Sequence, residues 1–136
     1  MRLWHEVLLP YISKQRLLGQ HRECCAMRGK GWGRPHSTVD YVWSHPYACL
    51  FRYHLIVCQL LIHEHSVNVD TDWLDPRYRG TILRYASPLS VLPWDQHAYV
   101  YPEHNTNYLL ECCRLLRERG EPAFQDPKGD HPCPMK

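Results

Sequence analysis

The stretch 47–65 is apolar on almost every side of a helix, and it restricts the fold more than any other part of the chain. Pro46 stands at its start, a position that favours helix initiation. Its apolar residues are Cys49, Leu50, Phe51, Leu55, Ile56, Val57, Cys58, Leu60, Leu61 and Ile62. A helix without a polar face is buried on all sides. Because Arg52, His54 and Gln59 interrupt the run, we predict a central buried helix and not a membrane span.

Two amphipathic helices are predicted on either side of it in the sequence. Ser13 can cap a helix that ends near Arg28, and Asn105 or Thr106 can cap a helix that ends before Gly120. On the first we expect a core stripe of Leu17, Leu18, His21, Cys24 and Cys25.

The remaining segments are short or irregular. Residues 1–12 read as an extended arm, 36–43 as either a short helix or a strand, and 81–102 as an ordered loop rich in proline and aromatic residues. The sequence therefore predicts an all-α fold, a compact single domain of three main helices with long ordered loops. We place the domain at 1–120 and a loose tail rich in proline and glycine at 121–136.

The first helix also carries a charged face. Gln15, Arg16, Arg22 and Glu23 share it, and Gly19 lies bare between them. Residues 1–35 hold seven basic residues against two acidic ones, although the whole chain has a net charge of only +2. A bare strip between arginines would let a polyanion approach the helix backbone closely. The alternative is an ordinary solvated face.

A basic loop follows this helix. It contains Arg28, Lys30 and Arg34 between glycines, together with Trp32. Its backbone and side chains could meet phosphates, and the indole could stack on a base or wedge into a duplex. The alternative is a solvent loop with the tryptophan folded onto the core.

Cysteines and histidines are numerous, seven and ten respectively. The cysteines include two adjacent pairs and no Cys-x-x-Cys, so we expect small buried side chains in a reducing compartment, the cytoplasm. No signal-peptide pattern opens the chain. His54 and the run 63–65 show neither His-Glu-x-x-His nor paired cysteine spacing, and we expect no metal site.

One motif in the first helix resembles a known family. Gln15, Leu17, His21, Arg22 and Glu23 match the first-helix signature of the phage endonuclease V-type pyrimidine-dimer DNA glycosylases, in particular a bacterial branch. Later stretches that are similar to this branch are His36-Ser-Thr-Val, 75–80, Tyr101-Pro-Glu-His and Tyr108-Leu-x-Glu-Cys. The resemblance covers about residues 1–120.

The resemblance implies a compact helical enzyme that cuts the glycosidic bond of a pyrimidine dimer in duplex DNA and then breaks the strand by β-elimination. It implies no cofactor. The nucleophile would be the α-amine, here of Met1, forming a Schiff base with the sugar. Glu23 would be the catalytic carboxylate, and Arg22 would act in catalysis and hold DNA. The further DNA-binding candidates are Arg2, Gln15, Arg16, Arg28, Lys30, Trp32, Arg34 and His36.

One departure from the family concerns the N-terminus. The bulky Arg2 normally prevents removal of Met1, so the free amine would lie one residue farther out, up to ~3.6 Å.

We expect damaged double-stranded DNA as partner, no membrane, and a monomer. Two other classes remain open: a non-catalytic DNA-binding module that uses the same face, and a metal-dependent nuclease that uses the histidines.

Overall fold

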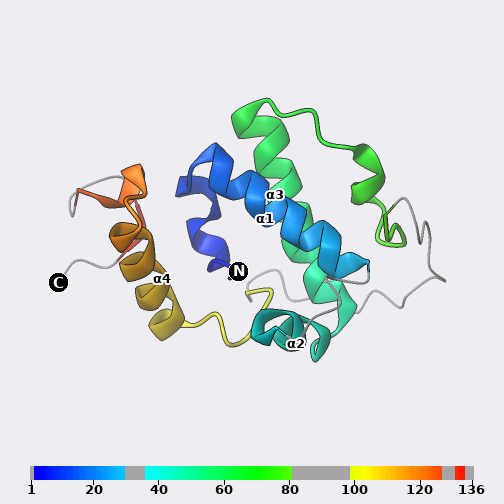
Figure 1. The fold of residues 1–136 in the computed structure, drawn as a ribbon, viewed down its shortest axis with the longest axis horizontal. Helices are drawn as coiled ribbons and strands as arrows, with labels where there is room; N and C mark the ends of the chain where they lie inside the picture. Colours follow the sequence, from blue (N-terminus) through cyan, green and yellow to red (C-terminus); the bar gives the residue numbers. More distant parts are fainter. Residues whose placement is uncertain (1, 30–35, 81–98, 127–130, 134–136) are drawn as a thin grey trace.

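The apolar stretch forms α3 (Tyr47–His65), the long helix near the centre of the structure (Figure 1). The computed structural model describes residues 2–29, 36–80, 99–126 and 131–133. Ser66 ends α3 in the left-handed conformation, with φ 54°. The buried side chains of the helix are Leu50, Phe51, Tyr53, His54, Val57, Cys58 and Leu61. The prediction of a central buried helix is confirmed.

Helix α1 (Lys14–Arg28) packs along α3 and makes the main helix–helix contact of the structure. Ser13 Oγ accepts a hydrogen bond from the Arg16 backbone N–H at 3.3 Å, as expected of the cap. The buried residues are Leu17, Gln20, Cys24, Met27 and Arg28. The predicted stripe was therefore partly wrong, because Gln20 and Arg28 occupy core positions that hydrophobicity alone assigns to solvent.

The shorter elements complete the N-terminal half. Residues 1–12 are not simply extended, since η1 (Glu6–Tyr11) forms a 3-10 helix that buries Leu8 and Leu9. Of the stretch 36–43, for which the sequence left a short helix or a strand open, Ser37–Trp43 forms the helix α2. The 3-10 helix η2 (Thr71–Leu74) follows α3. Within the described ranges there are four α-helices and no strand, so the all-α prediction is confirmed.

Helix α4 (Thr106–Glu118) begins where predicted, with Asn105 Oδ1 accepting from the Tyr108 backbone N–H at 3.0 Å. Gly120 follows its end with φ 76°, a conformation that glycine adopts without strain. In Figure 1 the N-terminal segment lies between α4 and the pair formed by α1 and α3. Hydrogen bonds from both sides hold this segment, from Tyr108 to the Leu3 carbonyl and from Tyr53 to the Trp4 carbonyl.

The segment after α4 corrects two predictions. The short helix η3 (Pro122–Phe124) buries Phe124 completely, and a disulfide joins Cys113 in α4 to Cys133. The described part of 121–136 is therefore packed rather than loose, and the cysteines are not all free thiols. The spacing of 20 residues between the two cysteines shows no sequence signature of this pairing.

None of the helices that the structure describes is both long and apolar enough to span a membrane. The predicted loop 81–102 lies outside the described residues as far as position 98.

Candidate active site and DNA-facing surface

Glu23 is a half-buried carboxylate on α1. Its Oε2 accepts a hydrogen bond from Gln20 Nε2 at 2.8 Å. Burial raises the pKa of the Glu23 carboxyl, while the positive charge of the N-terminus, the Gln20 hydrogen bond and Arg22 oppose that shift. A carboxyl in this balance can stabilise a nearby cation and can also take up or release a proton.

Gln20 links this carboxylate to the start of the chain. Its side chain is 2% exposed. Nε2 also donates to the Arg2 carbonyl at 3.0 Å, and Oε1 accepts from the Trp4 backbone N–H at 2.9 Å. The Tyr53 hydroxyl lies 2.8 Å from the same Oε1. A single side-chain amide therefore fixes the N-terminal segment and Glu23 relative to one another.

The sequence interpretation did not single out Gln20 as a functional residue. A signal was present, because Gln20 lies three residues after Leu17 and four before Cys24, on the face that both bury. A polar amide at a core position needs hydrogen-bond partners there. Those partners turned out to be the backbone of the N-terminal segment.

Arg22 and Gln15 lie exposed on α1. An Arg22 guanidinium nitrogen comes within 3.8 Å of the point where a Cβ on Gly19 would lie, so the side chain extends along the bare strip. These two candidates are placed where a polyanion could reach them.

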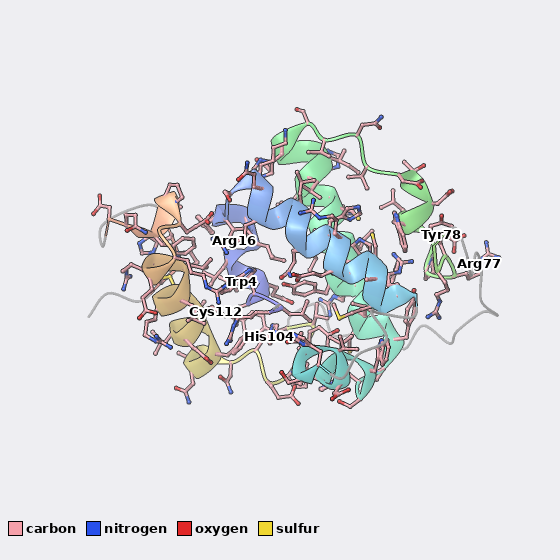
Figure 2. The ribbon with its side chains drawn as sticks, in the orientation of Figure 1. Trp4, Arg16, Arg77, Tyr78, His104 and Cys112 are labelled. Carbon is pink, nitrogen blue, oxygen red and sulfur yellow. A yellow bond between two sulfur atoms is a disulfide. The ribbon has the colours of Figure 1, made fainter. Side chains whose placement is uncertain are left out.

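Arg16 is less available than the sequence suggested. Its Nε donates to Glu121 Oε2 at 2.7 Å, and its guanidinium lies over the Trp4 ring, 5.7 Å from the centroid. Glu121 is 3% exposed and also accepts from the Ser13 backbone N–H. This ion pair anchors the segment after α4 to the beginning of α1, so Arg16 is not assigned to phosphate binding. Figure 2 shows Arg16 beside Trp4.

Arg28 was predicted to contact phosphate, and this prediction is wrong. The residue is 1% exposed and donates to the Tyr47 hydroxyl at 2.8 Å and to His54 Nδ1 at 3.0 Å. Its other acceptors are the backbone carbonyls of Trp73, at 2.7 Å, Asp75, at 2.7 Å, and Tyr78, at 3.0 Å. Every donor is used inside the protein, so Arg28 fastens the segment after η2 to α1.

His21, Cys25 and His54 bring potential metal-ligand atoms within 4.8 Å of one another. The geometry favours a hydrogen-bond chain instead. Because Arg28 can only donate, His54 Nδ1 must accept, and a neutral His54 then carries its proton on Nε2. That nitrogen lies 2.8 Å from His21 Nδ1, to which it donates. His54 Nε2, the nitrogen that a metal in this cluster would need, is therefore protonated, and the Arg28 guanidinium is hydrogen-bonded to the other nitrogen of the same ring.

The other candidates divide into two groups. Arg2 is half-buried and approaches Glu111 at 3.4 Å, and His36 Nδ1 accepts from the Thr38 backbone N–H at 3.1 Å as the cap of α2. Both keep part of their surface exposed. The remaining candidates, Met1, Lys30, Trp32 and Arg34, lie outside the described residues.

The fold and the site together are those of an all-helical protein that holds a shielded carboxylate beside its own N-terminal segment. A family model described as pyrimidine dimer DNA glycosylase matches residues 1–75, more than half of the 136 residues. The chain belongs to the pyrimidine dimer DNA glycosylase family. This is a family of DNA repair enzymes whose substrate is DNA.

The match includes α1, α2 and α3, and with them Gln20, Arg22 and Glu23. It ends at residue 75, whereas the resemblance seen in the sequence was traced to about residue 120. Helix α4 and the disulfide lie beyond the matched range. No curated protein and no solved structure matches the chain.

Proposed function

We propose that this protein is a glycosylase for pyrimidine dimers in duplex DNA that also cleaves the strand, using its N-terminal amine as the nucleophile. The observation that carries the proposal is the hydrogen bonding of Gln20, whose Nε2 contacts both the Arg2 carbonyl and Glu23. Met1 is bonded directly to Arg2, and from this connection we infer that its amine can reach the half-buried carboxylate of Glu23.

The chemistry follows from these two groups. The neutral amine of Met1 attacks C1′ of the sugar, and the bond from C1′ to the base breaks with its electron pair leaving on the base, which takes up a proton. An α-amine has a pKa near 8, so a useful fraction is neutral at physiological pH. Loss of the nitrogen proton and opening of the sugar ring give a Schiff base, and Glu23 stabilises the positive charge that develops.

Strand cleavage requires a second proton transfer. A base removes a proton from C2′ of the Schiff base, and the C3′–O bond breaks with its electron pair leaving on the phosphate. Glu23 is the group we assign to this proton transfer, because burial raises its pKa and makes it a stronger base than an exposed carboxylate. Water then releases the sugar remnant from the amine.

DNA binding is assigned to the exposed face of α1 and its surroundings. Arg22 and Gln15 are exposed on this face. The side chains of Arg2 and His36 are half-buried and partly accessible to solvent. Lys30, Trp32 and Arg34 stay predictions from the sequence for phosphate contacts and for a wedge beside a displaced nucleotide. We further propose a monomer. The Cys113–Cys133 disulfide removes the support that the cysteines gave to a reducing compartment.

Borohydride trapping tests this function. The protein is mixed with duplex DNA that carries a pyrimidine dimer or an abasic site, reduced, and digested for mass spectrometry. We expect a covalent adduct on residue 1 with both substrates, and loss of strand cleavage with retained DNA binding in Glu23→Gln. Binding without an adduct would favour the non-catalytic module, and cleavage that stops with a chelator would favour the metal-dependent nuclease.

A further inference from the structure

Arg79 lies on the ring of Tyr47, the first residue of α3. Its guanidinium carbon is 3.5 Å from the ring centroid, closer than any other arginine lies to an aromatic ring among the described residues. The ring covers one face of the guanidinium and restricts its orientation, whereas the N–H groups point outward from the edge. Arg79 follows the range that the family model matches, which ends at residue 75, so the match assigns it no role.

The Arg79 guanidinium has no acceptor among the residues that the structure describes. Its Nε is inaccessible and unpaired. The carboxylate nearest in sequence, Asp75, is occupied by Arg77, whose Nε donates to Oδ1 at 3.1 Å and whose Nη2 donates to Oδ2 at 2.8 Å. Part of Arg79 remains at the surface, so its outer nitrogens, Nη1 and Nη2, are the donors left for a ligand.

A second arginine places its charge beside the same ring. Arg28 Nε donates to the Tyr47 hydroxyl at 2.8 Å. The other acceptors of Arg28 are three backbone carbonyls and His54, an imidazole whose pKa is lowered by burial, so all of them are uncharged. Two guanidinium groups therefore share Tyr47, and neither forms an ion pair with a carboxylate of the described residues. An anion that binds at this ring reduces their mutual repulsion.

The backbone of Arg79 lies at the C-terminal end of α1. A Cβ on Gly29 would be 3.2 Å from the Arg79 carbonyl oxygen, so the two segments are in contact. Gly29 is on the same side of α1 as Arg22, about 10 Å farther along the axis, roughly the rise of three base pairs. Figure 2 shows Arg77 and Tyr78 beyond this end of the helix. A duplex that lies along the bare strip beside Arg22 would therefore reach Arg79.

We propose that Arg79 binds a phosphate group of the DNA backbone at the end of the strip that carries Gly19 and Arg22. The inference deepens the proposed function and rests on it in one respect, since DNA is the source of the phosphate. The outer edge of a guanidinium presents two parallel N–H groups that match two phosphate oxygens, and Tyr47 holds this edge in place. Arg79 then positions the duplex without touching the reacting sugar. A free phosphate ion has the same chemistry and is the other source.

The test is the salt dependence of binding to an undamaged duplex, measured by fluorescence anisotropy. In Arg79→Gln we expect the slope of log K against log salt concentration to fall by about 0.9 and the affinity at 0.1 M salt to fall up to about tenfold. Arg79→Lys keeps a point charge and should keep the wild-type slope. The matched control is Arg114→Gln, an exposed arginine of α4, which should also keep it. A lower affinity at an unchanged slope in Arg79→Gln would mean that the residue only packs on Tyr47, and would overturn the inference.

Inorganic phosphate is titrated separately and followed by amide shifts at positions 29, 47 and 79. Shifts that the duplex suppresses by competition support the phosphate contact with DNA. Shifts that are lost in Arg79→Gln while the DNA slope stays unchanged would assign the site to free phosphate and overturn the contact with DNA. Borohydride trapping separates the two proposals, because DNA bound without an adduct contradicts the proposed chemistry while the slopes still decide on Arg79. A wild-type protein that binds no duplex would contradict both.

Discussion

The side-chain amide of Gln20 donates to Oε2 of Glu23 across 2.8 Å, and both residues lie on α1 one turn apart. Gln20 is buried and holds the backbone of the N-terminal segment with its remaining hydrogen bonds. The carboxylate is thus oriented by a group that also positions the beginning of the chain. We assign Gln20 as a positioning residue for the proposed reaction.

Gln20→Leu should lower the rate of Schiff-base trapping and move the acidic limb of its pH profile to higher pH. The Gln20 hydrogen bond lowers the pKa of Glu23, so its removal lets burial raise that pKa further. The variant should also lose about 1–3 kcal/mol of stability, because the Trp4 N–H and the Arg2 carbonyl each lose a hydrogen-bond partner.

The matched control is Gln59→Leu, an exposed glutamine on α3. It should leave both the trapping rate and the pH profile as in the wild type. A Gln20→Leu profile that falls in rate but keeps its acidic limb in place would reduce Gln20 to a structural role and would contradict the assigned coupling to Glu23.

Arg22→Ala should weaken DNA binding and make it less dependent on salt. A single lost phosphate contact lowers the slope of log K against log salt concentration by about one. Fluorescence anisotropy at several salt concentrations measures this slope. Arg114→Ala is the control, since Arg114 is exposed on α4 and paired with Glu118. An unchanged slope in Arg22→Ala would remove Arg22 from the phosphate contacts.

Arg28→Lys should destabilise the protein by about 3 kcal/mol or more, although it keeps the positive charge. A lysine has three donors in place of five and cannot reproduce the planar arrangement that serves two side chains and three carbonyls. Urea denaturation measures the loss, and Arg114→Lys should change stability by less than about 0.5 kcal/mol. Full stability in Arg28→Lys would contradict the buried network.

Gly19→Ala should stabilise the fold and weaken DNA binding. Within a helix alanine is favoured over glycine by up to ~1 kcal/mol, and a Cβ here meets only the Arg22 guanidinium, at 3.8 Å. The added methyl group lies on the bare strip where we expect the polyanion. Thermal unfolding and anisotropy give the two quantities. Higher stability with unchanged DNA affinity would show that DNA does not approach the backbone at Gly19.

The main helices were predictable from the sequence because their signals are local. Ser13 and Asn105 cap α1 and α4 as expected, and the apolar run forms α3. The role of Arg28 was not predictable, since three of its five acceptors are backbone carbonyls 45 to 50 residues away in sequence. An arginine next to a basic, glycine-rich loop has the same local sequence pattern whether its side chain binds phosphate or is buried in the core.

The candidate site could likewise be predicted from the sequence only in part. Arg22 and Glu23 could be proposed from adjacency on one helix and from the family resemblance. The contribution of Gln20 depends on where the N-terminal segment lies, and that segment is fixed by Tyr53 in α3 and Tyr108 in α4. The disulfide between Cys113 and Cys133 likewise depends on a chain reversal after α4 that no local pattern indicates.

Acidification should destabilise the protein, because four histidines are held neutral. Burial lowers the pKa of His5, His21, His54 and His104 below 6.5, in the last case to about 4. In the unfolded chain these histidines take up protons near pH 6.5, whereas in the folded protein they stay neutral until a lower pH. The free energy of unfolding is therefore unaffected by them above pH 6.5 and decreases as the pH falls from 6.5 toward their folded-state pKa values. His104 alone would account for roughly 3 kcal/mol. Glu23 acts in the opposite direction, since burial raises its pKa, but it is one group against four.

Urea denaturation at pH 7.5 and pH 5.0 measures this effect, and we expect a clearly lower free energy of unfolding at pH 5.0. His104→Phe keeps a ring stacked on Tyr108 and cannot be protonated, so it should reduce the difference between the two pH values. His63→Phe is the control, because His63 is exposed on α3 and its loss should leave the difference unchanged. Equal free energies at the two pH values would mean that burial does not hold these imidazoles neutral.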